Sequence, residues 1–364
     1  MMRFITIYGI KRTLIKVLGR SRYPISLPNK QKDRSISVIG CGQFAFSTIC
    51  YMLYFNRRGS FLGTYDIDIQ NANSLSRLYQ FKKTYSSADE LIDDPNCKLI
   101  YIASNHSSHT PYALSAITRN IEVFIEKPIA TNMNQFQELV KAIESSNQNI
   151  YVGYNRPFSP AMMHLKPTIE NLGTPLTLSC YVTGHFLEPE HWYRKPEEGT
   201  RICGNMGHWI DLMIYLLNIV NAIPPDQFEI SITYSNKEVL DDNLGVSFTT
   251  ENNDLISILM SSRSEPFEGI NETINLQCGK VIAKIDDFRK MTVWNGHKKS
   301  TKRYWPKDVG HKLSVLQPFL PEKRIFEEIK ISTLIMLQVM DMVKDSITKK
   351  KISVNEEMTR IMQS

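Results

Sequence analysis

The chain has 364 residues, 42% of them hydrophobic, and a formal net charge of +6. This length favours two domains, and this apolar content is ordinary for a globular chain with a packed core. The charge is uneven, because residues 1–34 hold nine Lys or Arg and one acid, Asp33, which leaves −2 on the rest. The body therefore lacks the basic groove typical of nucleic-acid binding, and no apolar run reaches the roughly 18 residues of a membrane span.

A basic extension occupies residues 1–34. Over residues 10–20, apolar side chains recur at helical spacing with Lys and Arg between them, and a proline-containing linker follows. We favour an arm that packs on its own or a partner subunit, with peripheral contact to an anionic membrane surface as the alternative. The extension shows no secretory signal and no cofactor motif, so a chain starting near Asp33 is expected to bind its cofactor normally.

Strand-like and helix-like segments alternate from residue 35 to residue 154. Strands are predicted at 35–40, 61–66, 98–104, 121–126 and 149–154, and helices at 44–55, 88–94, 110–119 and 133–146. The strands are apolar nearly throughout, which indicates a parallel sheet covered by helices on both faces.

The pattern changes after residue 154. Strands that alternate polar and apolar residues are predicted at 176–184, 228–235, 245–250, 255–262, 273–278 and 280–286, with helices at about 205–218 and 326–346. Asn252-Asn253 and Gly279 stand where hairpins should turn. The fold class is therefore α/β, with a doubly wound parallel sheet followed by an α+β domain that carries a large, mostly antiparallel open sheet.

Cysteine usage argues against a disulfide scaffold and against a metal site. The cysteines stand far apart, with no Cys-x-x-Cys pair and no Cys/His cluster. They are Cys41, Cys50, Cys97, Cys180, Cys203 and Cys278. We expect no bound metal, and the pattern predicts a protein of the reducing cytoplasm.

The turn after the first predicted strand carries a phosphate-binding pattern, G-x-G-x-x-A at residues 40–45. The first glycine permits a tight turn, the second lets the backbone approach a pyrophosphate, and the small Ala45 allows close packing of helix on strand. The helix N-terminus then faces the phosphates. The predicted cofactor contacts here are Gly40, Gly42, Gln43, Phe44 and Ala45.

An acid ends the second predicted strand, since Asp66 lies 24 residues after Gly42. Its carboxylate can accept both ribose hydroxyls of an NAD adenosine and would repel a 2′-phosphate. No Lys or Arg occurs in the six residues that follow, so NAD is predicted over NADP. Asp68 is expected to cap the next segment.

The strand at 121–126 runs into Glu126-Lys127-Pro128. Open α/β sheets bind ligands at the carboxyl ends of their strands. Pro128 lacks an N–H and fixes φ, so the strand must stop there, and the Lys–Pro bond could be cis. Alone, Lys127 would be a solvated charge, but the glycine turn in the same predicted sheet favours a functional lysine.

These segments, in this order, resemble the Gfo/Idh/MocA oxidoreductases. The resemblance rests on VIGCGQFA (38–45), Asp66, Glu126-Lys127-Pro128, GYNRPFSP (153–160), GTRICGNMGHWID (199–211), IDDFR (285–289) and VGH (309–311). It covers roughly residues 35–345. It implies a Rossmann domain at 35–154 and a substrate and oligomerisation domain at 155–364, assembled as a dimer or tetramer.

The activity that this resemblance implies is an NAD-dependent dehydrogenase. Hydride would move between nicotinamide and a secondary alcohol or ketone of a sugar, inositol or nucleotide-sugar. Lys127 would bind the reacting oxygen, where a cation stabilises a developing alkoxide, and His208 would be the partner base. Two alternatives stay open: an NADP-dependent carbonyl reductase, and a dinucleotide-binding regulatory protein that has lost turnover.

The motif around His208 departs from the family. Much of the family carries an aspartate four residues before this histidine, whereas this chain has Gly204. Asn205 is expected to cap the helix, and Asp211 could hold the imidazole in place of the missing carboxylate.

Further candidates follow from position along the chain. Ser104, His106 and Glu126 are predicted on the cofactor side, and Tyr154, Arg156 and Asn205 on the substrate side, with a structural ion pair as the alternative for Arg156. His109, His185, His191 and Trp192 are weaker candidates for the same pockets, and Asp286 and Asp287 are interpreted as structural.

Overall fold

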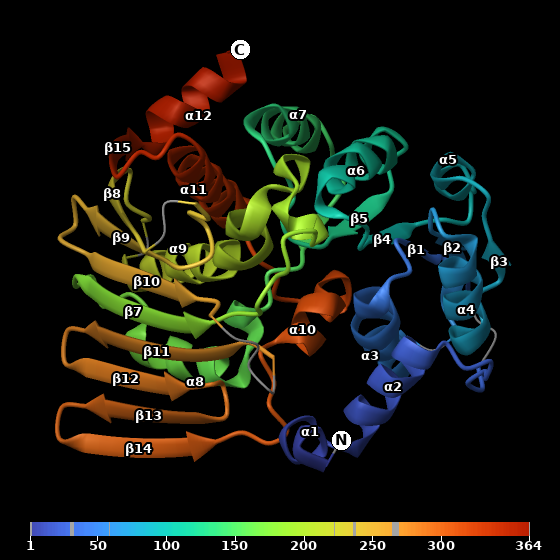
Figure 1. The fold of residues 1–364 in the computed structure, drawn as a ribbon, viewed down its shortest axis with the longest axis horizontal. Coiled ribbons are helices and arrows are strands. Elements are labelled where there is room, and N and C mark those ends of the chain that lie inside the picture. The colour runs from blue at the N-terminus through green and yellow to red at the C-terminus, as the bar shows by residue number, and fades with distance from the viewer. Residues whose placement is uncertain are drawn as a thin grey trace. The chain divides into compact units, whose positions relative to one another are not determined.

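The structure is a computed structural model that describes residues 2–29, 33–57, 59–221, 223–235, 238–263 and 269–363. The chain forms two compact units (Figure 1). The first, unit 1, comprises the described residues up to Gly153 together with His311–Phe326, and the second, unit 2, comprises Tyr154–Gly310 and the residues from Glu327 onward. The segment 311–326, expected in the second domain, thus belongs to the first, and residues 30–32 of the expected linker lie outside the described ranges.

Unit 1 is built on a six-stranded parallel sheet in the order β3-β2-β1-β4-β5-β6. The strands are β1 (Ile36–Ile39), β2 (Phe61–Tyr65), β3 (Lys83–Thr84), β4 (Leu99–Ile102), β5 (Glu122–Ile125) and β6 (Ile150–Val152). The central strand β1 pairs Val38 with Thr64 on one side and with Tyr101 on the other. All four residues of β1 are buried, which explains the continuous apolar pattern of the sequence.

Helices follow the strands in alternation, as predicted. They are α3 (Cys50–Arg57), α4 (Ile69–Tyr79), α5 (Ala88–Ile92), α6 (His109–Thr118) and α7 (Met133–Glu144), and α3 is preceded by a π-helical turn at Ala45–Ile49. The sequence analysis missed β3 and also α4, whose interior holds two Asn and two Ser, residues that favour caps and turns. Asp68 caps α4 as expected, because its carboxylate accepts a hydrogen bond from Gln70 N–H (2.9 Å).

The basic extension forms two helices, α1 (Met2–Tyr8) and α2 (Ile10–Ser21), that belong to unit 1. Ile15 is 5% exposed and packs in the same hydrophobic core as Phe46 and Tyr79. The prediction of an arm packed on its own subunit is therefore confirmed. Among the described residues, no helix is long and apolar enough to cross a bilayer.

Unit 2 contains a nine-stranded sheet in the order β14-β13-β12-β11-β7-β10-β9-β8-β15. The strands are β7 (Leu176–Thr183), β8 (Gln227–Tyr234), β9 (Leu244–Thr250), β10 (Leu255–Ser261), β11 (Asn271–Cys278), β12 (Val281–Asp286), β13 (Lys290–Asn295), β14 (Lys298–Arg303) and β15 (Lys349–Ser353). Only β7 and β10 pair in parallel, so the sheet is mostly antiparallel, as predicted. Both expected hairpin turns are present, between β9 and β10 and between β11 and β12.

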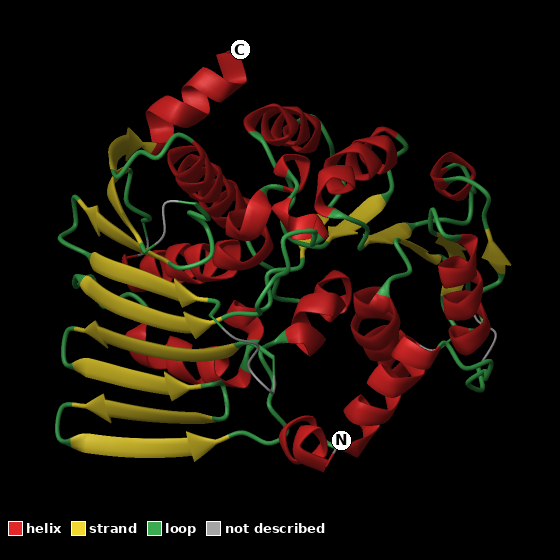
Figure 2. Cartoon of the chain, viewed as in Figure 1, coloured by secondary structure: helices red, strands yellow, loops and turns green. Residues whose placement is uncertain are grey.

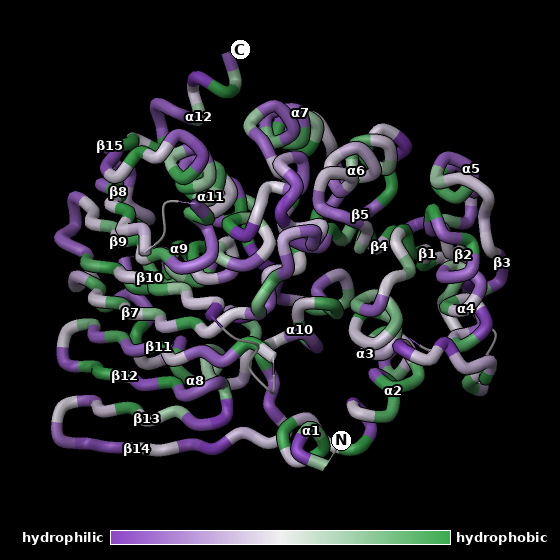
Figure 3. The backbone as a smooth tube through the Cα atoms, in the orientation of Figure 1, coloured by the Kyte–Doolittle hydropathy of each residue, from purple (hydrophilic) through white to green (hydrophobic). Residues whose placement is uncertain are grey.

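Buried and exposed residues alternate along β7, β10, β11 and β12, and one face of the sheet is covered by helices (Figures 2 and 3). The helices of unit 2 are α8 (Pro160–Ile169), α9 (Gly207–Asn221), α11 (Phe326–Lys344) and α12 (Val354–Gln363), whereas α10 (His311–Leu316) packs in unit 1. The sequence analysis missed β13, β14 and β15. Strand β14 reads KKSTKR with all six residues exposed, so only its pairing with β13 makes it a strand.

Candidate active site

The glycine turn has the geometry that its residues predict. Gly40 has φ +86°, and a Cβ there would lie 2.4 Å from the backbone N of Ser104, so no other residue fits. A Cβ at Gly42 would meet nothing within 4 Å, which leaves open space in front of the turn. Ala45 is fully buried at the start of the helix. The turn therefore offers a cradle into which a pyrophosphate fits.

Asp66 is tied directly to this turn. Its Oδ2 accepts a hydrogen bond from Cys41 N–H (2.6 Å), and its Oδ1 accepts one from Asp68 N–H (2.8 Å). The carboxylate thus lies at the carboxyl end of β2, beside the cradle. That is the place from which a carboxylate binds the ribose hydroxyls of an adenine dinucleotide.

The two remaining residues of the turn have other partners for their side chains. Gln43 Nε2 donates to Lys16 O on α2 (3.2 Å). The Phe44 ring is 37% exposed and stands edge-on to the His311 ring at 5.6 Å. Any cofactor contact from Gln43 is therefore expected from its backbone rather than its side chain.

The loop after β4 forms a polar cluster with the loop after β5. His109, 1% exposed, has Nδ1 at 2.8 Å from Pro128 O and Nε2 at 3.1 Å from Ser104 O. Thr110 Oγ1 donates to Ile129 O (2.8 Å). A neutral imidazole can donate from one nitrogen only, so the tautomer decides which of the two carbonyls accepts its hydrogen bond. His109 therefore holds the backbone that follows Lys127.

The other two residues predicted near this loop lie in the same cluster. Ser104 Oγ is 2.6 Å from Ser108 Oγ. His106 is 4% exposed, and its ring lies 5.9 Å from that of His109.

Glu126 and Lys127 stand side by side at the end of β5. The peptide bond between Lys127 and Pro128 is cis, and Lys127 is half-buried. Glu126 is 8% exposed, and burial raises its pKa from 4.5 to about 8 against the opposing charge of Lys127. A Cβ at Gly153 would lie 2.6 Å from the Glu126 carboxyl carbon, so Gly153 makes room for this side chain.

In unit 2, His208 lies in the first turn of α9. A π-helical turn at Ile202–Met206 precedes it, so the chain is already helical at Asn205, and the expected N-cap role of Asn205 is corrected. The Tyr154 ring stands edge-on to the His208 ring at 6.0 Å. Asp211 is fully buried and accepts a hydrogen bond from Ser332 Oγ on α11 (3.3 Å).

The place of a side chain at Gly204 is taken by Tyr193. A Cβ on Gly204 would lie 2.5 Å from Cε2 of the Tyr193 ring. The missing family aspartate is thus matched by an aromatic ring packed against the bare backbone, one turn before His208. This pairing could not be predicted from sequence, because the two residues lie on different segments.

Arg156 is paired inside unit 2. Its guanidinium, 4% exposed, binds Glu272 through Nε–Oε2 (2.8 Å) and Nη2–Oε1 (3.2 Å). Trp209 Nε1 donates to the same carboxylate (2.8 Å), and Arg156 lies 4.4 Å from the centre of that indole ring. This geometry favours the structural ion pair over a substrate clamp.

Two further predicted residues also have side-chain partners inside unit 2. The Tyr154 hydroxyl, on a side chain 1% exposed, lies 3.7 Å from Met336 Sδ. Asp287 is buried and binds Lys307 Nζ (2.5 Å), in line with the structural role expected of it.

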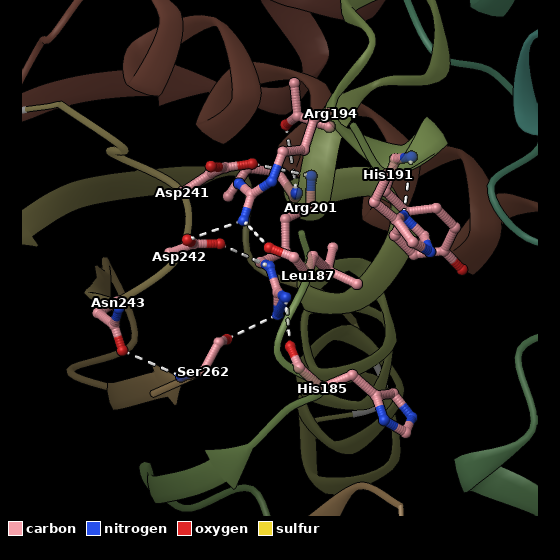
Figure 4. A network of polar contacts seen from close by, with 12 residues as sticks. His185, Leu187, His191, Arg194, Arg201, Asp241, Asp242, Asn243 and Ser262 are labelled. Atoms are coloured by element: carbon pink, nitrogen blue, oxygen red, sulfur yellow. Dashed lines mark hydrogen bonds and ion pairs between the residues drawn. The ribbon is translucent and has the colours of Figure 1, made fainter. Parts of the chain in front are cut away.

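A polar network that the sequence did not predict anchors the segment before His208 (Figure 4). Arg201, 1% exposed, binds Asp242 (3.1 Å), Ser262 Oγ (2.6 Å) and the carbonyl oxygen of His185. Arg194 binds the same Asp242 (3.0 Å). The loop that carries His185 is thereby fixed to the start of the His208 motif.

Comparison with known proteins identifies the first unit. A family profile described as "Oxidoreductase family, NAD-binding Rossmann fold" matches residues 34–154. Over these residues, the chain matches the Gfo/Idh/MocA oxidoreductase family. The predicted dinucleotide-binding region therefore matches an NAD-binding Rossmann fold.

The curated relatives of this chain are distant. It is 24% identical over 230 residues to "Uncharacterized oxidoreductase YrbE" of Bacillus subtilis, an alignment that covers 63% of this chain and 67% of the relative. It is 28% identical over 149 residues to "Inositol 2-dehydrogenase" of Acidothermus cellulolyticus, which covers 40% of this chain and 44% of that protein.

Among solved structures, the fold resembles levoglucosan dehydrogenase in complex with NADH and levoglucosan. The TM-score is 0.69 at 16% identity, and the match covers 88% of this chain and 99% of the other. At that identity the likeness establishes the fold, including the second unit.

Proposed function

We propose that this protein is an NAD-dependent oxidoreductase that transfers a hydride between nicotinamide and a secondary alcohol or ketone of a sugar, inositol or nucleotide-sugar. One observation carries the proposal: Asp66 is hydrogen-bonded to the glycine turn through Cys41 N–H (2.6 Å), in a parallel sheet in which Lys127 follows the end of β5. The family match and the relatives named after inositol and levoglucosan support the substrate class.

The residues of unit 1 fit the cofactor in charge and shape. The open space at Gly42 would take the pyrophosphate, and the Asp66 carboxylate would accept hydrogen bonds from the adenosine ribose. Because that carboxylate would repel a 2′-phosphate, NAD is preferred over NADP. When bound, NAD supplies the hydride acceptor.

Lys127 and His208 have separate roles in the reaction. Removal of the hydride from a carbinol carbon leaves an oxygen that must lose its proton. The Lys127 ammonium stabilises negative charge on that oxygen, and the His208 imidazole accepts the proton. His109 positions Lys127 by holding Pro128 O (2.8 Å).

Assembly into a homo-oligomer is part of the proposal. One face of the unit 2 sheet leaves apolar side chains exposed, among them Tyr181 (47%), Leu255 (54%) and Leu259 (47%). Exposed apolar side chains of this kind suit a second copy of the chain.

The test is a dehydrogenase screen of sugars, inositols and nucleotide-sugars with NAD⁺ and NADP⁺, followed by absorbance at the reduced-nicotinamide band. We expect turnover of a cyclic polyol or sugar with NAD⁺. If both nucleotides bind but no member of these classes turns over, a regulatory protein is favoured instead. Faster turnover with NADP⁺ would favour the reductase alternative.

A further inference from the structure

The N-terminal arm contacts the first turn of the helix that faces the cofactor cradle. Arg12 donates to Ser47 O (2.5 Å) and to Thr48 Oγ1 (2.8 Å), both in the π-helical turn at Ala45–Ile49. A π-helical turn shifts the backbone hydrogen-bond ladder by one residue, so a carbonyl in it gains from an outside donor. The arm therefore supports the helix at its least regular point.

The N-terminal arm also packs closely against the glycine turn, at Gly19 of α2. A Cβ on Gly19 would lie 2.8 Å from the side-chain amide of Gln43, which itself binds Lys16 O. Helix α2 can approach Gln43 this closely because Gly19 has no side chain.

Arg22, directly after α2, reaches the glycine turn itself. Its Nη2 donates to Cys41 O (2.8 Å), its Nη1 donates to Ser74 Oγ on α4 (2.9 Å), and its guanidinium lies 4.6 Å from the centre of the Phe46 ring. These contacts with the glycine turn, α4 and the π-helical turn hold the Arg22 guanidinium in one position.

Arg22 and Asp66 bind opposite ends of one residue. Arg22 holds the carbonyl of Cys41, and Asp66 Oδ2 accepts from its N–H (2.6 Å). Burial lowers the pKa of Arg22, and the nearby carboxylates of Asp66 and Asp68 oppose that shift without reversing it. A positive charge therefore stands beside the carboxylate that selects the cofactor.

We propose that Arg22, supplied by the arm, is a specificity-determining residue of the cofactor site. Its side chain binds the backbone of the glycine turn. Its positive charge partly cancels the negative charge of Asp66, so the repulsion between Asp66 and the 2′-phosphate of NADP is weaker than it would be without Arg22. The inference rests on the proposed cofactor but not on the proposed substrate. It also reverses the expectation that the extension is dispensable for cofactor binding.

The experiment measures the dissociation constants of NAD⁺ and NADP⁺ by tryptophan fluorescence quenching on the full chain, without substrate. Arg22→Gln should weaken both nucleotides and raise the ratio of the NADP⁺ to the NAD⁺ constant about fivefold, since a nearby charge is removed. Arg22→Lys keeps the charge and should leave that ratio within about twofold of the parent. A purely structural role would weaken both nucleotides equally.

Two further variants keep the test sharp. Ser74→Asp places a carboxylate against the guanidinium without removing it, so the ratio should rise even if Arg22→Gln folds poorly. Arg20→Gln is the matched control, because Arg20 is an exposed arginine on the same helix. For Arg20→Gln, the ratio of the NADP⁺ to the NAD⁺ dissociation constant should equal that of the parent.

The outcomes separate the two proposals. An unchanged ratio in both Arg22→Gln and Ser74→Asp overturns the specificity role. Failure of the parent chain to bind either nucleotide overturns the proposed function instead. A ratio that shifts equally in Arg20→Gln would show a general charge effect and would also overturn the assignment to Arg22.

Discussion

The two units differ in how their polar residues come together. In unit 1, Gly40, Asp66 and Lys127 all follow strands of one parallel sheet, and the carboxyl ends of such strands share an edge. In unit 2, Arg156 pairs with Glu272 116 positions away, within a buried network. Polar residues at parallel strand ends are thus brought together by topology. In the second unit, the partners depend on tertiary packing.

The largest expected effect concerns the lysine of unit 1. Lys127→Met should leave NAD⁺ binding nearly unchanged and lower kcat by about 10²–10⁴-fold, the range for losing one acid–base or oxyanion group. Steady-state kinetics on the substrate found by the screen, with NAD⁺ titrations, measure both quantities. A loss of less than about tenfold would remove Lys127 from the chemistry.

His208→Asn extends this test to unit 2. If the two groups act on one substrate, each single variant should lose a similar factor, and the double variant should lose far less than the product of the two. Multiplicative losses would show that the two side chains act independently.

For unit 2, the prediction concerns the stability that depends on the buried ion pair between Arg156 and Glu272. Arg156→Met leaves Glu272, whose side chain is 1% exposed, without its cation, and should cost about 3–5 kcal/mol of unfolding free energy. Urea unfolding at neutral pH measures it. Lys351→Met is the control, because Lys351 is 80% exposed in its pair with Glu229 and should change stability by less than about 1 kcal/mol. A stable Arg156→Met protein that loses substrate affinity would instead restore the substrate clamp.

Sequence reasoning succeeded where a local rule decides the structure. The Gly40 turn, the Asp68 cap and the alternating strands of unit 2 each follow from backbone geometry or from periodicity. It failed where contacts between residues far apart in the sequence decide the structure. Strand β14 exists because β13 offers it hydrogen bonds, and the space beside Gly204 is filled by Tyr193.

The arm shows the same limit within unit 1. The helical pattern over residues 10–20 was readable, but the contact of Arg22 with Cys41 O was not, since it depends on where the arm packs. The six residues after Asp66 hold no Lys or Arg, whereas the fold brings Arg22, which precedes Asp66 in the sequence, to the glycine turn.

A smaller effect is expected at the ribose end of unit 1. Asp66→Ala removes the carboxylate and should narrow the preference for NAD⁺ over NADP⁺ by about 1–3 kcal/mol, the usual cost of an unmade charged hydrogen bond. The same fluorescence titration measures it. Combined with Arg22→Gln, the change should be non-additive, because both residues bind Cys41. Equal or tighter binding of NADP⁺ by the parent chain would contradict the NAD preference.

The last prediction is a dependence of stability on pH, and it arises from Glu126. Burial raises its pKa from 4.5 to about 8 in the folded chain, so the folded state holds a proton that the unfolded state releases. The stabilisation is therefore complete below pH 4.5 and is lost as the pH rises toward 8.

Glu126→Gln should remove this dependence, because the amide cannot titrate. Thermal unfolding of both proteins between pH 5 and pH 9 measures the difference in Tm; the parent should lose Tm relative to the variant as the pH rises, most of it below about pH 8. Asp286→Asn is the control, since Asp286 is exposed on β12, and its Tm should change with pH in parallel with that of the parent. Parallel curves for parent and Glu126→Gln would mean that the Lys127 charge keeps Glu126 ionised throughout, so that unit 1 holds a carboxylate–ammonium pair at the end of β5.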